Sequence, residues 1–132
     1  MHPKSKFSIL LADDDDDDLN ILSAVLEAHP QFTVVGRLTN GPRIIDWMNE
    51  GVKPDIIMTD MYMPMMTGTE VIDRLASTDS IGATRIIIFS TICNEAEEDK
   101  YKMMDNVAFF TKPDSLKSYG ELAGKILDCF FL

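Results

Sequence analysis

Short apolar segments recur along the chain, and each is followed by a more polar stretch. Several of them have uninterrupted apolar cores, as in Ile86-Ile87-Ile88-Phe89. Continuous apolar runs of this length are typical of strands buried on both faces of a parallel sheet. The predicted strands are Phe7–Ala12, Phe32–Leu38, Asp55–Thr59, Arg85–Ser90 and Val107–Thr111.

Helical patterns fill the intervals between these strands, because apolar residues recur there at helical spacing. Asn94 resembles an N-cap, and the three glutamates that follow it favour the positive end of a helix. Ser115 is placed to cap the last helix. The order βαβαβαβαβα predicts an α/β fold, a doubly wound (βα)5 with a five-stranded parallel sheet and helices on both faces.

Neither a repeat nor a linker interrupts this pattern. At 132 residues the chain has the length of one domain that buries a continuous core. We therefore expect a single domain over residues 1–132, with its core at about residues 6–130 and no output domain.

The charge balance narrows the classes of partner. The chain has 22 acidic and 12 basic residues, and six of the acids form the run Asp13–Asp18. Since the basic residues are not clustered, we expect no direct binding to nucleic acid or to an anionic membrane. No apolar segment is as long as the apolar region of a signal peptide or as a transmembrane helix. This predicts a cytoplasmic protein. Cys93 and Cys129 lack metal-ligand spacing, so we expect free thiols there.

Polar residues follow the carboxyl ends of four predicted strands. In an open parallel sheet these ends border the crevice in which ligands bind. The residues expected to converge there are Asp13, Asp14, Asp60, Ser90, Thr91 and Lys112.

This set has the chemistry of a phosphoryl-transfer site. Three carboxylates in one crevice repel one another unless a cation neutralises them. Hard oxygen ligands with room for water favour Mg²⁺. Such a cation, together with Lys112, would balance the charge of a phosphoryl group that arrives at a carboxylate.

Four motifs in order give the chain a family resemblance. Residues 9–14 read ILLADD, residues 54–64 read PDIIMTDMYMP with Gly68 after them, residues 86–91 read IIIFST, and residues 109–113 read FFTKP. Together they resemble the receiver domains of two-component response regulators, over essentially the whole chain. The resemblance implies a flavodoxin-like fold with strand order 2-1-3-4-5. It also implies a phosphoprotein that catalyses its own phosphorylation and dephosphorylation.

The resemblance assigns the chemistry to particular residues. Asp60 would be the phosphoacceptor and Lys112 would pair with the phosphoryl oxygens. Asp14 and Asp60 would bind Mg²⁺ directly, together with the backbone carbonyl of Tyr62. Asp13 would contribute through water.

The resemblance also implies a conformational switch and a shaped loop. Ser90 would move to hydrogen-bond the phosphoryl group, while Phe109 occupies the aromatic switch position without the hydroxyl that a tyrosine would offer. Pro64 and Gly68 would shape the loop after Asp60. Pro113 would shape the loop beyond the last strand. The resemblance implies that the Lys112–Pro113 peptide bond is cis.

The implied partners are proteins. A sensor histidine kinase or a histidine phosphotransfer protein would donate the phosphoryl group. Because no output domain is expected, the chain is interpreted as a stand-alone regulator that signals to a downstream protein target. We expect it to act as a monomer or a weak homodimer.

Three other interpretations remain open at this point. A magnesium-dependent phosphatase of the haloacid dehalogenase type would also use an Asp-x-Asp after a strand, but Asp17 replaces the expected Thr or Val. A degenerate receiver that binds partners without phosphate conflicts with the complete set of site residues. A flavin phosphate would be repelled by Asp13–Asp18. Within that run we expect Asp15 to Asp18 to form a solvated charge block.

Overall fold

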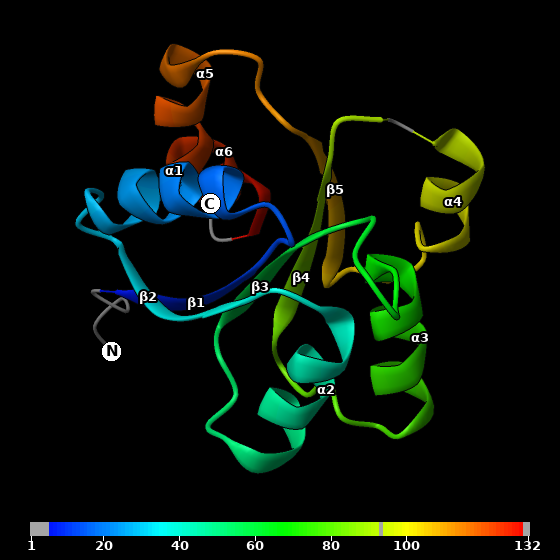
Figure 1. The fold of residues 1–132 in the computed structure, drawn as a ribbon. Coiled ribbons are helices and arrows are strands. Elements are labelled where there is room, and N and C mark those ends of the chain that lie inside the picture. Colours follow the sequence, from blue (N-terminus) through cyan, green and yellow to red (C-terminus); the bar gives the residue numbers. More distant parts are fainter. Residues whose placement is uncertain (1–5, 93, 131–132) are drawn as a thin grey trace.

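A single parallel sheet forms the centre of the molecule. The computed structural model describes residues 6–92 and 94–130. All neighbouring strands pair in parallel, in the order β2-β1-β3-β4-β5, so the expected doubly wound, flavodoxin-like order is confirmed (Figure 1). The strands are β1 (Phe7–Ala12), β2 (Phe32–Leu38), β3 (Ile56–Asp60), β4 (Arg85–Ser90) and β5 (Val107–Thr111).

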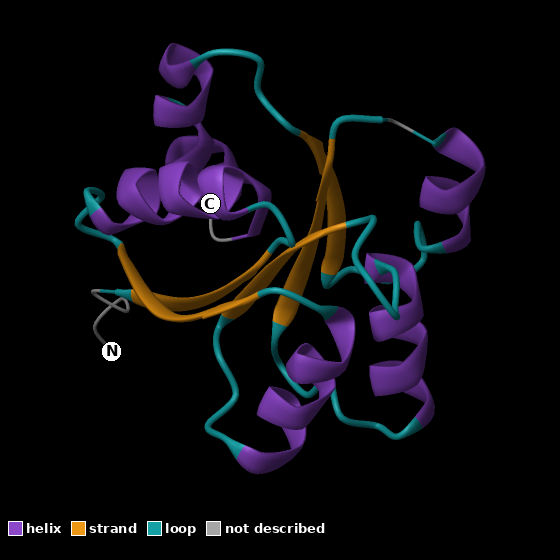
Figure 2. Cartoon of the chain, viewed as in Figure 1, coloured by secondary structure: helices purple, strands orange, loops and turns teal. Residues whose placement is uncertain are grey.

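Helices follow the strands in alternation (Figure 2). The last predicted helix is split in two at Glu121, whose amide bonds to the Ser118 carbonyl at i−3. Gly120, a weak helix former, precedes this tightened turn. The helices are α1 (Asp16–Glu27), α2 (Gly41–Glu50), α3 (Gly68–Ser77), α4 (Glu95–Lys100), α5 (Leu116–Gly120) and α6 (Leu122–Phe130). None of the helices in the described ranges is long and apolar enough to cross a membrane.

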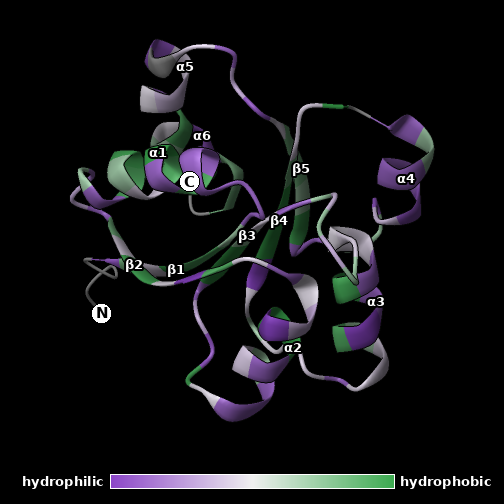
Figure 3. Cartoon of the chain, viewed as in Figure 1, coloured by the Kyte–Doolittle hydropathy of each residue, from purple (hydrophilic) through white to green (hydrophobic). Residues whose placement is uncertain are grey.

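The sheet separates two hydrophobic cores. On one face, α1 and α6 pack against alternate residues of the central strands, with Leu22, Leu26 and Ile126 fully enclosed. On the other face, α2 and α3 pack against the intervening residues, with Ile44 and Ile72 at the centre. Figure 3 shows the most hydrophobic ribbon in the central strands. Burial on both faces explains why these strands read as continuous apolar runs.

Polar side chains define where the helices begin. The predicted caps are confirmed, since the side chains of Asn94 and Ser115 accept hydrogen bonds from the amides of Glu97 and Ser118. Thr67 forms a full capping box at the start of α3. These caps set the helix starts just beyond the strand ends, at the edge of the sheet where the site lies.

The residue at the C-terminal end of helix α4 is buried, although the helix itself is not. The helix has only six residues, none of them buried. The residue that follows, Tyr101, is 7% exposed, and its hydroxyl donates a hydrogen bond to Asp73 Oδ1 on α3 at 2.8 Å. The Tyr101 ring also lies 6.0 Å from the Phe109 ring on β5. Tyr101 therefore connects the end of α4 to both α3 and β5.

Gly68 permits the close turn between β3 and α3. A Cβ atom on Gly68 would lie 2.8 Å from the Asp60 carbonyl oxygen and 2.8 Å from Ile88 Cδ1. Its amide donates a hydrogen bond to the Met61 carbonyl at 2.7 Å. Any side chain here would push the end of β3, which carries Asp60, out of its place.

We expect Gly68→Ala to destabilise the fold by about 1–3 kcal/mol, because backbone must shift to relieve the overlap. Gly124→Ala is the matched control, since nothing lies within 4 Å of a Cβ atom there. Alanine in place of glycine at this exposed helix position should instead stabilise the fold by up to about 1 kcal/mol. Urea unfolding of both variants measures the two changes. A Gly68→Ala variant as stable as Gly124→Ala would contradict the steric role.

Candidate functional site

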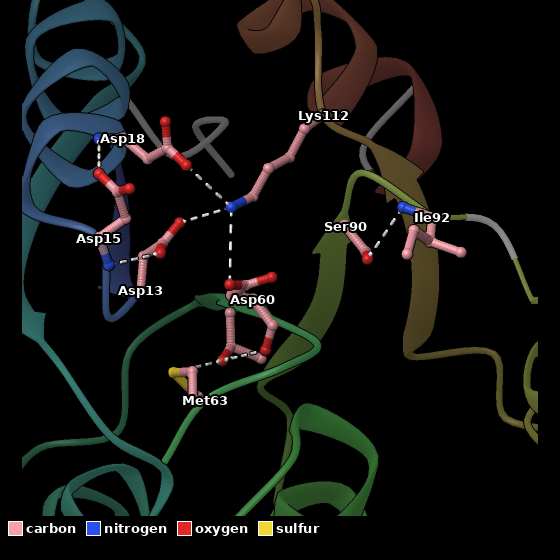
Figure 4. Close-up of polar contacts among 9 residues, drawn as sticks. Asp13, Asp15, Asp18, Asp60, Met63, Ser90, Ile92 and Lys112 are labelled. Carbon is pink, nitrogen blue, oxygen red and sulfur yellow. Dashed lines mark hydrogen bonds and ion pairs between the residues drawn. The ribbon is translucent and has the colours of Figure 1, made fainter.

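Side chains from three strand ends converge at one edge of the sheet, and Ser90 from a fourth strand is directed to Ile92 (Figure 4). Asp13 and Asp14 follow β1, Asp60 ends β3, Ser90 ends β4, and Lys112 follows β5. Each of Asp13, Asp14 and Asp60 offers a carboxylate oxygen, and these three oxygens lie within 4.8 Å of one another. The convergence predicted from the strand ends is therefore present for the three carboxylates and Lys112.

The Lys112 ammonium lies at the centre of this group. Its Nζ atom is 2.8 Å from Asp13 Oδ2 and 3.6 Å from Asp60 Oδ2, and its side chain is 8% exposed. Burial by itself lowers the pKa of Lys112. The hydrogen bond to Asp13 and the negative charges of Asp60 and Asp13 outweigh that effect and hold the pKa above its ordinary value. Lys112 is therefore a permanent positive charge in the site.

Asp60 has an unusually high proton affinity. Burial raises the pKa of its carboxyl group to about 6, and the charge of Asp13 raises it as well. Lys112 and hydrogen bonds to the backbone amides of Met61 and Tyr62 lower it, but they do not offset burial. The ionised form of Asp60 thus lacks part of the positive charge that it needs, which an added cation would supply.

The two aspartates after β1 have different surroundings. Both oxygens of Asp13 are engaged, since Oδ1 accepts from the Asp15 amide and Oδ2 from Lys112. Asp14 is exposed, and within residues 6–92 and 94–130 its carboxylate has no hydrogen bond or ion pair. Asp14 is therefore free to bind a cation directly, which matches the division of roles that the resemblance implies.

Three carboxylate oxygens, from Asp13, Asp14 and Asp60, lie within 4.8 Å of one another and form a ligand set that suits Mg²⁺. The donor set therefore fits the expected ion. The carbonyl of Tyr62 as a further ligand stays a prediction.

Ser90 and Phe109 lie beside the acidic group. The buried Ser90 hydroxyl accepts a hydrogen bond from the Ile92 amide at 3.3 Å, and the Lys112 amide bonds to the Ser90 carbonyl at 2.8 Å. Phe109 is half-buried and packs with the core that contains Tyr101. In this structure the Ser90 side chain is thus engaged on its own loop, and the movement expected of Ser90 stays a prediction.

The expected cis bond before Pro113 is wrong. Within the described residues no peptide bond is cis, so the Lys112–Pro113 bond is trans. The trans form of a bond before proline is preferred by only about 0.5–1 kcal/mol, so the surroundings of Pro113 decide the isomer. Pro64 is exposed in the loop after β3, beside Met65, which has a positive φ of 71°.

The acidic run after Asp14 is more ordered than expected. Asp15 is the N-cap of α1 and accepts a hydrogen bond from the Asp18 amide. Asp18 Oδ2 lies 3.2 Å from Lys112 Nζ. Asp15 is exposed, as expected of a solvated block, whereas that interpretation is wrong for Asp18, which pairs with Lys112. An aspartate just before a helical stripe is a recognised cap signal, whereas the Asp18 contact has no sequence signature.

Known proteins share both the sequence pattern and the fold. The model of the response regulator receiver domain matches residues 9–119. The chain belongs to the receiver domain family. The haloacid dehalogenase interpretation thereby loses its support.

Curated relatives are longer proteins that match this chain over part of their length. The protein-glutamate methylesterase/protein-glutamine glutaminase of Halalkalibacterium halodurans is 31% identical over 112 residues, which cover 83% of this chain and 31% of that protein. The nitrate/nitrite response regulator NarL of Escherichia coli K12 is 36% identical over 92 residues, or 70% of this chain and 40% of NarL. This chain thus spans less than half of either relative.

A solved receiver has the same architecture. The response regulator domain of Thermotoga maritima CheB superposes with a TM-score of 0.76 at 25% identity. The match covers 96% of this receiver and 98% of that domain. The similarity extends from β1 to the final helices, so the site is set in a complete receiver fold.

The raised pKa of Asp60 makes a prediction for the metal-free receiver. The folded state holds this proton more tightly than the unfolded state, so ionisation destabilises the fold as the pH rises from 3.8 to about 6. In EDTA at pH 7.5, Asp60→Asn should raise the free energy of unfolding by about 1–2 kcal/mol, a value that allows for partial solvent screening. The gain should disappear near pH 4. Urea unfolding across this range measures it.

Asp46→Asn is the control for this measurement, because Asp46 is exposed on α2 and lies outside the site. Its unfolding free energy should follow that of the unmodified receiver at every pH. A gain in Asp60→Asn that stays constant from pH 4 to pH 7.5 would show that ionisation of Asp60 is not its cause.

Proposed function

We propose that this receiver accepts a phosphoryl group on Asp60 and passes the signal to a partner protein by changing conformation. The observation that carries the proposal is the position of Lys112, whose ammonium lies 3.6 Å from the Asp60 carboxylate within a group of acidic side chains. A lysine placed there can balance the charge of an incoming phosphoryl group.

The donor is proposed to be the phosphohistidine of a sensor histidine kinase or of a histidine phosphotransfer protein. One carboxylate oxygen of Asp60 forms a bond to phosphorus, while the bond from phosphorus to the histidine nitrogen breaks. The electron pair of that bond leaves with the imidazole. No proton is removed from Asp60, because the carboxylate is ionised above its pKa of about 6.

Residues of this chain position and neutralise the transferred group. Lys112 pairs with the phosphoryl oxygens, and its high pKa keeps it protonated throughout. Asp14, Asp60 and the Tyr62 carbonyl hold Mg²⁺, with Asp13 acting through water. When bound, the ion supplies the positive charge that the three carboxylates and the phosphoryl oxygens require.

Ser90 and Phe109 are proposed to convert phosphorylation into movement. The Ser90 hydroxyl, which accepts a hydrogen bond from the Ile92 amide, turns to donate its own proton to a phosphoryl oxygen, and Phe109 repacks against Tyr101, its ring neighbour. Because Tyr101 attaches α4 to α3 through Asp73, repacking displaces α4. A downstream protein then reads the altered surface.

The cellular setting follows from the same proposal. A receiver that exchanges phosphoryl groups with a sensor kinase works in the cytoplasm, as a monomer or a weak homodimer. Action as a stand-alone regulator stays a prediction, and so does the absence of nucleic-acid binding.

The first test identifies the acceptor. With acetyl phosphate and Mg²⁺, the receiver should gain one phosphoryl group by intact-mass measurement, and Asp60→Asn should lose at least about 90% of that uptake, since its amide is a poor nucleophile. Asp46→Asn, exposed on α2, controls for the loss of one charge and should be labelled like the unmodified receiver. Undiminished uptake by Asp60→Asn would remove Asp60 as the acceptor.

The second test concerns the cation. Asp14→Ala should weaken Mg²⁺ binding by about tenfold or more, because a direct carboxylate ligand is lost. Asp16→Ala removes an equal charge from an exposed position outside the three-carboxylate group. Calorimetric titration compares the two variants. Equal Mg²⁺ affinities would exclude Asp14 from the site.

A further inference from the structure

Lys112 has a partner that the proposed chemistry does not use. Asp18, the third residue of α1, places Oδ2 3.2 Å from Lys112 Nζ. Its amide donates to Asp15 Oδ1, which fixes it in the first turn of the helix. Figure 4 shows the Lys112 ammonium between Asp13, Asp18 and Asp60.

The three distances show where the ammonium is held. Lys112 Nζ lies 2.8 Å from Asp13, 3.2 Å from Asp18 and 3.6 Å from Asp60. The first two are hydrogen bonds, whereas the third exceeds normal hydrogen-bond length. The ammonium is thus bonded on the α1 side of the crevice and only faces the phosphoacceptor.

We propose that Asp18 is a positioning residue that holds the Lys112 ammonium on the α1 side and thereby restrains phosphorylation of Asp60. The inference rests on the proposed function, because it assumes that Lys112 serves the phosphoryl group on Asp60.

Competition for the ammonium produces the restraint. A lysine ammonium has three donors, and a phosphoryl group on Asp60 brings three strong acceptor oxygens. Asp13 is buried within the site and can keep its bond to Lys112. The Asp18 side chain is 36% exposed and its bond is the longer one, so water can replace Lys112 there. The Asp18 bond is therefore the one that yields when the phosphoryl group arrives.

The charge of Asp18 acts in the same direction. A carboxylate near Lys112 offsets part of the positive charge that attracts an anionic phosphodonor. Removal of the charge and removal of the hydrogen bond should therefore both speed phosphorylation. Among Asp15 to Asp18, Asp18 is the residue for which an ion pair with Lys112 is found in the described part of the chain.

The test separates the contact from the charge by a matched pair of variants. Asp18→Asn loses the charge and leaves at most a neutral amide contact with Lys112, whereas Asp17→Asn loses an equal charge from the preceding, exposed position in the same helical turn. Asp18→Glu retains a carboxylate that can reach Lys112. The initial rate of phosphorylation by acetyl phosphate is measured for each variant at its own saturating Mg²⁺ concentration.

We expect Asp18→Asn to be phosphorylated about two- to fivefold faster than Asp17→Asn, which corresponds to the strength of a partly exposed ion pair. Asp18→Glu should stay within about twofold of the unmodified receiver. Beryllofluoride, a phosphoryl mimic, should also bind about two- to fivefold more tightly to Asp18→Asn, since it competes for the same ammonium. A residue that only supports α1 would not change this affinity.

Equal or lower rates for Asp18→Asn than for Asp17→Asn overturn the inference, and a lower rate would show that Asp18 presents Lys112 productively. Both outcomes leave the proposed function intact, because the unmodified receiver still takes up phosphate. A receiver that takes up none overturns the proposed function and the restraint together.

Discussion

An excess of negative charge around one ammonium governs this site. Parallel strand pairing places Asp13, Asp14 and Asp60 at the same sheet edge, within 4.8 Å of one another, and α1 adds Asp18. Lys112 is the cation that meets them, and it cannot neutralise them all. The surrounding carboxylates hold the pKa of Lys112 above its ordinary value, while burial, with a smaller contribution from the charge of Asp13, raises the pKa of Asp60. The fold therefore holds Asp60 in a state that favours the arrival of a cation.

Much of this arrangement could be predicted from the sequence, because burial imposes a strong pattern. Four strands have the predicted bounds, and β3 is displaced by one residue, to Ile56–Asp60. Parallel strands covered on both faces tolerate few polar residues, so the first polar residue after each strand is easy to identify. Since the carboxyl ends of parallel strands share one edge, the convergence of Asp13, Asp14, Asp60 and Lys112 could be predicted from position alone, whereas their roles came from the family resemblance. The strand order came from the family resemblance rather than from the strands themselves.

The details that escaped prediction depend on choices among similar energies. A proline bond has two accessible isomers, and the trans form at Pro113 is set by contacts that no motif encodes. The last helix breaks at Glu121 after Gly120, where helix propensity is weak. Lys112 could pair with several carboxylates, and its bond to Asp18 depends on the geometry of the first turn of α1. Local sequence patterns identify the charged residues of the site. Which carboxylates pair with Lys112 depends on the folded structure.

The lack of buried side chains in α4 gives the receiver an uneven stiffness. Helices α1, α2, α3 and α6 each bury apolar side chains against the sheet, whereas the six residues of α4 bury none. Displacing α4 exposes little new apolar surface, so its free energy of local opening is low compared with that of the other helices. Under the proposed function, a change of packing at Phe109, whose ring lies beside that of Tyr101, would act on this helix. Helix α4 thus yields more easily than the helices that bury a hydrophobic face.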